Sequence, residues 1–184
     1  AYTGMRMPTL NELYRPYSVF PVTTQANADL KSEKLSGFEA GIDATLAPGM
    51  TVSLTAFDNK VKNAIANVSI GTNLQQRQNL PAIKARGIEL ATSLGQGPLH
   101  FDGTLAWTDA EMRAHGDAAE LDGRRPAQSP RWAMSGTLSY RPQPGWTFAA
   151  TLRHVSKVYE SDLQTDVLRA ATTLDAYAEV PLAG

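Results

Sequence analysis

Four residues near the start of the chain bring aromatic rings and a positive charge together: Tyr14, Arg15, Tyr17 and Phe20. An arginine can pair with an anion through charge-assisted hydrogen bonds, and a tyrosine offers both a ring face and a hydroxyl. The four residues form an aromatic and basic patch in a long loop, which makes them candidates for ligand binding. The alternative is that the four side chains pack a loop against the rest of the protein.

Two later polar stretches carry the remaining candidate ligand-binding residues. Arg124 and Arg125 can pair with an anion in the same way. Their alternative is a solvated pair balanced by Glu120 and Asp122. Tyr159 opens an acidic stretch that either holds a cation or is an ordinary surface loop. The two arginines and the tyrosine therefore join the first group as candidates.

No arrangement of residues predicts catalysis or a resident metal. His100, His115 and His154 lie far apart, and no two of them have the spacing of metal ligands. Cysteine is absent, which excludes disulfides and thiolate metal sites. With 17 basic against 18 acidic residues, the chain also lacks the basic surplus of a nucleic-acid binder. We therefore expect neither an enzyme nor a cofactor nor a nucleic-acid partner.

The elements that must position these residues are predicted to be β-strands. Apolar and polar residues alternate with period two in about seven stretches between residues 34 and 184. The stretches are Gly37–Leu46, Met50–Ala66, Ile83–Leu94, Leu99–Ala110, Arg131–Tyr140, Trp146–Lys157 and Thr172–Leu182. In the second stretch the alternation slips near Phe57, which predicts a bulge or the exit from a membrane. Residues 1–33, interrupted by prolines, are predicted to be mostly loop with a helical turn at Leu10–Tyr14.

The connections between these stretches alternate in length. Tight proline and glycine turns occupy residues 46–49, 95–98 and 141–145, whereas long polar segments follow the other strands. Residues 181–184 resemble the start of a further short turn. A meander with turns on one rim and long loops on the other is the plan of a bacterial outer-membrane β-barrel. The long loops, including residues 1–33, are then expected on the extracellular side.

Aromatic residues stand at both ends of one strand face. Trp107 and Trp132 lie beside a long loop, and Tyr140 and Trp146 flank a short turn. The eight steps from Trp132 to Tyr140, at ~3.4 Å each, project to about 21 Å when the strand is tilted by about 40°. A membrane barrel has an apolar band of about 25 Å between two aromatic girdles. The four residues are therefore predicted to form membrane girdles.

The opposite face of the predicted strands is polar, and its charged residues are expected to point into a barrel lumen: Glu39, Asp43, Glu89, Asp102 and Arg153. The alternative is a soluble β-sandwich that binds a ligand or partner, in which these residues face solvent. Bacterial barrels have even numbers of strands, and an open sheet edge is not tolerated in lipid. Because seven is odd, the chain is predicted to be an all-β antiparallel meander forming a segment of a larger transmembrane barrel.

Several short sequence motifs resemble those found in the C-terminal part of the barrel of TonB-dependent outer-membrane receptors. Residues 6–14 (RMPTLNELY) match the family's R-x-P-T-L-x-E-L-Y, and residues 37–41 (GFEAG) match its G-x-E-x-G strand. Residues 27–34 (NADLKSEK) resemble N-P-x-L-K-P-E, except that Ala28 and Ser32 replace both prolines. Residues 86–90 (RGIEL) and 125–131 (RPAQSPR) resemble two further motifs of the family, R-G-x-E and P-x-x-S-P-R.

This resemblance implies a barrel of about 22 strands, closed by an N-terminal plug, in the outer membrane of a bacterium. It implies uptake of an iron–siderophore complex or cobalamin, driven by the TonB complex through a plug that this sequence lacks. Siderophore complexes are often anionic and carry flat aromatic chelators, which suits the group around Arg15. The resemblance further implies that the apolar face contacts outer-membrane lipid and that the lumen residues contact the plug or water.

Overall fold

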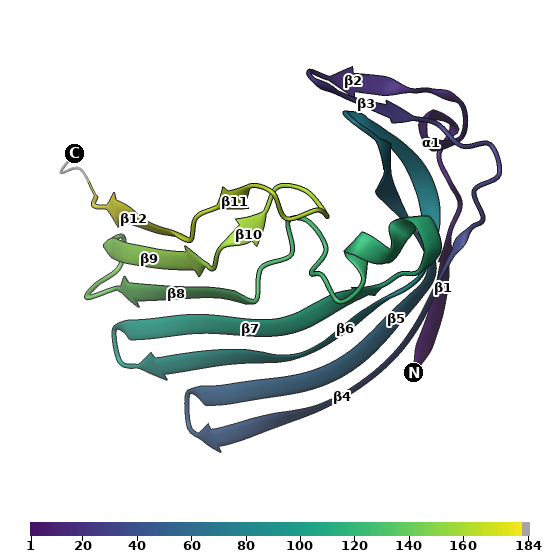
Figure 1. Ribbon diagram of the computed structural model, residues 1–184. Helices are drawn as coiled ribbons and strands as arrows, with labels where there is room; N and C mark the ends of the chain where they lie inside the picture. Colours follow the sequence, from purple (N-terminus) through teal and green to yellow (C-terminus); the bar gives the residue numbers. More distant parts are fainter. Residues whose placement is uncertain (182–184) are drawn as a thin grey trace.

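The computed structural model describes residues 1–181. Its main body is one curved, ten-stranded sheet, in which eight strands lie side by side in the order β1-β4-β5-β6-β7-β8-β9-β12 (Figure 1). Neighbours along this path are antiparallel, which confirms the predicted all-β meander. The strands are β1 (Tyr2–Arg6), β4 (Glu33–Ala47), β5 (Met50–Gly71), β6 (Leu74–Gln96), β7 (Leu99–Arg113), β8 (Trp132–Tyr140), β9 (Thr147–Val155) and β12 (Ala171–Glu179). Most of the turn expected at residues 181–184 lies outside the described residues.

The expectation that residues 1–33 are mostly loop is wrong. β1 pairs with β4 and adds an eighth strand to the path, so the odd count was an undercount. A helix, α1 (Leu10–Tyr14), follows at the predicted helical turn, and then a hairpin of β2 (Tyr17–Val19) and β3 (Val22–Gln25). The prolines fall between these elements, where they end one element and begin the next, so they do not prevent structure.

The polar segment after Ala66 is not a long loop but the outer half of a long hairpin. β5 and β6 continue to Gly71 and Leu74, so only Thr72 and Asn73 lie between them. Polar residues on both faces of β6, at residues 75–79, hide the alternation there. The bulge expected near Phe57 is also wrong, because the β5–β6 register shifts only between Ser69 and Gly71.

The pairing register separates two faces of the sheet, since directly opposed residues lie on the same side. On the apolar face, Phe38, Ile42 and Leu174 are 60%, 65% and 70% exposed. A sandwich would bury this face under a second sheet, whereas lipid would cover it in a membrane. The five charged residues predicted to face a lumen all lie on the other, polar face: Glu39, Asp43, Glu89, Asp102 and Arg153.

Aromatic pairs stand at both ends of the apolar face. Trp107 and Trp132 are directly opposed, with ring centroids 6.3 Å apart. At the other end Tyr140 is opposed to Phe148, whose ring lies 5.9 Å from that of Trp146. This is the arrangement expected of two membrane girdles. No helix among residues 1–181 is long and apolar enough to cross a membrane.

The buried core lies at the end of the sheet away from the short turns. A 3₁₀ helix, η1 (Gly116–Leu121), packs against the outer half of β5. The fully buried members of this core are Ala64, Val68, Leu80, Met112 and Leu121. Because the core stabilises the long connections rather than the strands of the apolar band, it holds the rim of the sheet in a defined shape.

The side-chain alternation of β5 changes phase just before this core. Val61 and Ala64 pack into the same cluster although three positions separate them, which a regular strand does not allow. Between them Asn63 has a positive φ of 55°. Its carbonyl accepts a 2.7 Å hydrogen bond from Asn79 Nδ2, and its own Nδ2 donates to Ser32 O at 3.3 Å. Asn63 therefore changes which side chains of β5 face the buried core, so that the even-numbered residues after it point into the core.

Replacing Asn63 with valine is expected to destabilise the outer half of β5 by about 1–2 kcal/mol, because a β-branched residue is strained at positive φ. Asn63→Gly should cost less than half as much, since glycine adopts this conformation freely. Hydrogen exchange of the amides of residues 64–68 measures the difference. Equal protection in both variants would contradict the role assigned to this residue.

Candidate functional site

The first candidate group lies where α1 ends and β2 begins. Tyr14 is the last residue of α1 and is 67% exposed, and Arg15 caps the helix. Arg15 and Tyr17 line an open pocket of about 450 Å³ with Asn11 and Arg77. Phe20 is separate from them, at the tip of the β2–β3 hairpin, and is 97% exposed. Two of the four predicted residues, Arg15 and Tyr17, thus line one open pocket, Tyr14 directly precedes them in the chain, and Phe20 lies apart at the hairpin tip.

Arg77 on β6 completes this surface and was not predicted. Its guanidinium donates to the carbonyls of Asn11 and Arg15, the latter at 3.2 Å. It also lies over the ring of Tyr17, 5.0 Å from the centroid. A cation at a helix C-terminus is favourable, and so is one over an aromatic face. No local signal marks Arg77, because its segment is polar on both faces and shows no alternation.

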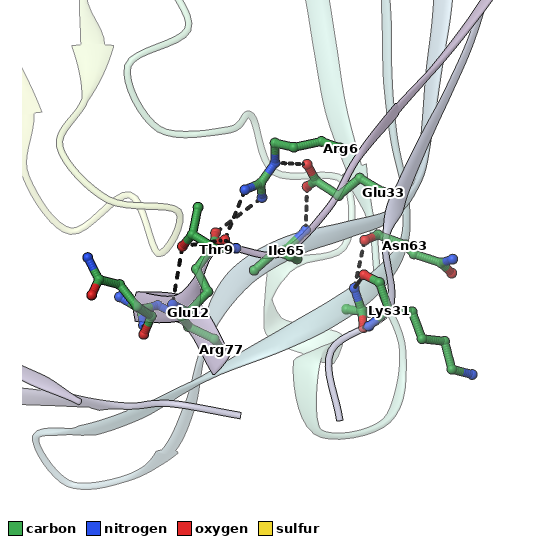
Figure 2. Close-up of polar contacts among 10 residues, drawn as sticks. Arg6, Thr9, Glu12, Lys31, Glu33, Asn63, Ile65 and Arg77 are labelled. Atoms are coloured by element: carbon green, nitrogen blue, oxygen red, sulfur yellow. Dashed lines mark hydrogen bonds and ion pairs between the residues drawn. The ribbon is translucent and has the colours of Figure 1, made fainter. Parts of the chain in front are cut away.

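A charged network fixes α1 to the sheet (Figure 2). Arg6 on β1 forms two parallel bonds with the Glu12 carboxylate, at 2.9 and 3.1 Å, and also pairs with Glu33 on β4. The second oxygen of Glu33 accepts the Ile65 amide at 2.8 Å. Thr9 and Glu12 cap the helix reciprocally. The ion pair between Arg6 and Glu33 therefore joins two of the motifs that resemble the family, residues 6–14 and 27–34.

The pair of Glu12 and Arg6 is ionised at neutral pH. Burial works to raise the pKa of the Glu12 carboxyl, but hydrogen bonds from Arg6 and Thr9 outweigh it and lower the pKa to about 2. Hydrogen bonds to Glu33 and Glu12 raise the pKa of Arg6 in turn. One guanidinium thus holds two carboxylates, and the α1 segment depends on it for its position.

The second candidate group is brought together by two facing loops. The amide of Gln128 donates to Tyr159 O at 2.9 Å, and Gln164 Nε2 donates to Arg125 O at 3.1 Å. Arg124 donates to the carbonyl of Leu163. The predicted residues Arg124, Arg125 and Tyr159 therefore lie in one loop cluster. The cluster includes β10 (Val158–Tyr159) and β11 (Val167–Leu168).

Within this cluster the arginines hold the loops together. The Arg125 side chain is only 11% exposed, and it donates to Thr108 O at 3.0 Å and to Asp109 at 3.2 Å. Burial lowers the pKa of Arg125, although the nearby carboxylate of Asp109 acts to raise it. The expected balance by Glu120 and Asp122 is not what is found, since Asp122 accepts the Ala114 amide instead. The exposed cation available to a ligand is therefore in the first group, at Arg15.

Neither the histidines nor the acidic residues form a metal site in the described part of the chain, which holds no group of three or more potential ligands. Asp162, in the acidic stretch after Tyr159, accepts the Ala127 amide at 2.8 Å. On the polar face, Arg153 pairs with Asp175, and Asp43 accepts a hydrogen bond from Ser53. The polar face thus offers water or a partner a hydrogen-bonding surface.

Comparison with known proteins identifies relatives of this sheet. A family model described as "TonB dependent receptor-like, beta-barrel" matches residues 1–183. The vitamin B12 transporter BtuB of Photobacterium profundum is 25% identical over 185 residues, covering 97% of this chain and 27% of that protein. Hemoglobin and hemoglobin-haptoglobin-binding protein C of Haemophilus influenzae is 30% identical over 107 residues, 52% of this chain and 10% of its own length.

Solved structures share the fold. The siderophore receptor PirA of Acinetobacter baumannii matches with a TM-score of 0.64 at 15% identity, over 85% of this chain and 27% of that one. The copper transporter OprC matches with a TM-score of 0.69 at 18% identity, over 94% and 26% of the two chains. This chain spans about a quarter of the length of these structures. Family members are outer-membrane receptors and transporters, and the chain belongs to the TonB-dependent receptor-like β-barrel family.

Proposed function

We propose that this chain forms part of an outer-membrane transporter of a bacterium, which captures a metal chelate at the rim of the long connections. The chelate is an iron–siderophore complex or a similar ligand such as cobalamin. Energy for import comes from the TonB complex, acting through a plug domain formed by residues other than these. The polar face, with Glu39, Asp43, Glu89, Asp102 and Arg153, lines the lumen, and the apolar face contacts lipid.

The observation that carries this proposal is an exposed aromatic and cationic surface on a rigid support. Arg15 makes no side-chain hydrogen bond or ion pair with the described residues, so its guanidinium is available to an anion. Tyr17 stands beside it on β2, held by Arg77 and by a hydrogen bond from Asn67 at 3.2 Å. A preorganised cation beside an aromatic ring favours an anionic aromatic chelate. Among the relatives above, PirA is named a siderophore receptor, which supports the same class of cargo.

Arg15→Gln is expected to weaken binding of ferric enterobactin, an anionic aromatic probe, by about tenfold, as the loss of a charge-assisted hydrogen bond predicts. Binding is measured on the purified full-length receptor, and growth of the deletion strain on different iron sources identifies the transported chelate. Arg141→Gln, at the rim of short turns, is the matched control. The proposal would be overturned if Arg15→Gln bound ferric enterobactin like the wild type and if the deletion strain grew like its parent on every iron source and on cobalamin.

A further inference from the structure

The pocket beside α1 contains two arginines, one from each side. Arg15, at the end of α1, is exposed, whereas Arg77 reaches the pocket from β6 and is half-buried. The pocket has a volume of about 450 Å³. Small-molecule sites are concave spaces of about 300–1,000 Å³ that place a few polar groups around an apolar or aromatic lining. A single aromatic group of a larger chelate therefore suits this pocket.

The guanidinium of Arg77 is held by its neighbours through only part of its hydrogen-bonding capacity. Its Nη1 donates to the carbonyls of Asn11 and Arg15, and the group lies over the ring of Tyr17. A guanidinium carries five N–H donors in a planar fork. Its Nη2 and Nε make no hydrogen bond within residues 1–181. Because Arg77 lines the pocket, these donors are available to a ligand in a fixed orientation.

The positive charge around the pocket is not neutralised by an ion pair in the described part of the chain. Neither Arg15 nor Arg77 has a carboxylate within 4.0 Å. The sequence contains no acidic residue from position 59 to position 88, a stretch that includes the outer half of the β5–β6 hairpin. On the α1 side, Glu12 is already paired within the charged network, and Asp29 forms no ion pair. Two cations beside one pocket repel each other, and an anion between them removes this cost.

We propose that Arg77 determines specificity in this pocket, because it supplies the second cation that selects a catecholate group of the cargo. A catecholate carries two adjacent anionic oxygens on an aromatic ring. Arg15 and Arg77 can pair with the oxygens through charge-assisted hydrogen bonds, and the Tyr17 ring offers a surface to the aromatic group. Neither a hydroxamate chelate nor cobalamin carries a dianionic aromatic group. The inference rests on the proposed function and narrows its cargo to catecholate chelates.

Arg77→Gln tests the second cation in the purified full-length receptor. Binding of ferric enterobactin, a chelate with three catecholates, is expected to weaken about tenfold, as the loss of a charge-assisted hydrogen bond predicts. Added salt should weaken binding by the wild type, and this salt dependence should be smaller in Arg77→Gln. A purely structural loss would lower the affinity by the same factor at every salt concentration. Arg77→Lys keeps the charge and should keep the salt dependence.

Arg169→Gln is the matched control, because it removes an arginine from an exposed position in the connection between β11 and β12. This variant should bind ferric enterobactin like the wild type. The inference is overturned if Arg77→Gln binds as tightly as Arg169→Gln, or if Arg77→Gln shows the full salt dependence of the wild type.

A comparison of cargo classes on the wild type separates this inference from the transport proposal. Ferric enterobactin should bind more tightly than ferrichrome, a hydroxamate chelate, and more tightly than cyanocobalamin. If either of these binds as tightly, or if ferric enterobactin does not bind, the assignment of a catecholate group is overturned. Growth of the deletion strain on the different iron sources and on cobalamin then decides separately whether the transport proposal stands.

Discussion

Leu121→Ala is expected to loosen η1 from the β5–β6 hairpin by about 3 kcal/mol. Leu121 is fully buried in the core of the rim, where it packs with Val68, Leu80 and Met112. Truncating a buried leucine loses its transfer free energy and leaves a cavity that the surroundings fill only partly. Since the η1 segment has few other buried residues, the loss should appear as local opening. Hydrogen exchange and limited proteolysis of residues 114–124 measure it.

Two controls separate cavity formation from a general effect of mutation. Leu121→Met keeps the volume and should cost less than about 1.5 kcal/mol. Leu10→Ala, at a position that is 76% exposed, should change stability by less than about 0.5 kcal/mol. Should residues 114–124 stay as protected in Leu121→Ala as in the wild type, the buried cluster is not what holds η1 in place.

Arg6→Met should release α1 from the sheet at a cost of about 2–3 kcal/mol. The substitution keeps an apolar stem but leaves the Glu12 and Glu33 carboxylates without their shared cation, and charge-assisted hydrogen bonds are worth about 1.5–3 kcal/mol each. The Arg6 side chain is 46% exposed, so solvent screening keeps the cost below the sum of the two pairs. Because α1 carries Tyr14 and Arg15, binding of ferric enterobactin should weaken in parallel.

The pH dependence of this contact gives a second readout. The Glu12 pKa is about 2 in the folded chain and about 4.3 in an unfolded one. A lowered carboxyl pKa adds stability that is fully present above about pH 4.3 and is lost as pH falls toward 2. Protection of the α1 amides should therefore decline over that range in the wild type. In Arg6→Met the decline should be smaller, and an identical pH profile would argue against the pairing.

The sequence predicted the strands of the apolar band well because one physical rule governs them. Alternation is clear where one face is apolar and the other polar. A glycine marks the turn at residue 49, where the backbone has a positive φ of 77°. The same rule failed on the outer half of β6, where polar residues lie on both faces. It also did not reveal the phase change at Asn63, because Ala64, Ile65 and Ala66 are apolar on both faces of the strand directly after it.

The candidate site was predictable in its residue types but not in its contacts. Tyr14, Arg15 and Tyr17 were found from their own chemistry, since aromatic and cationic neighbours are visible in sequence. Arg77 and Glu33 were not recognised as their supports, because both act on α1 and β2 from strands far along the chain. Long-range pairing, such as that of Arg6 with Glu33, has no local signature.

The parallel pairing of β3 with β6 sets an order of folding. Thr23, Thr24 and Gln25 pair with Leu74, Gln75 and Gln76, about fifty residues later, while most other strands pair with the next strand in the chain. Local hairpins close faster than long-range contacts, which must first meet the entropy of loop closure. The segment that carries Tyr14, Arg15 and Tyr17 is therefore expected to dock on the sheet only after β6 has formed. Although it is synthesised before β6, the candidate binding surface is completed only after β6 has formed behind it.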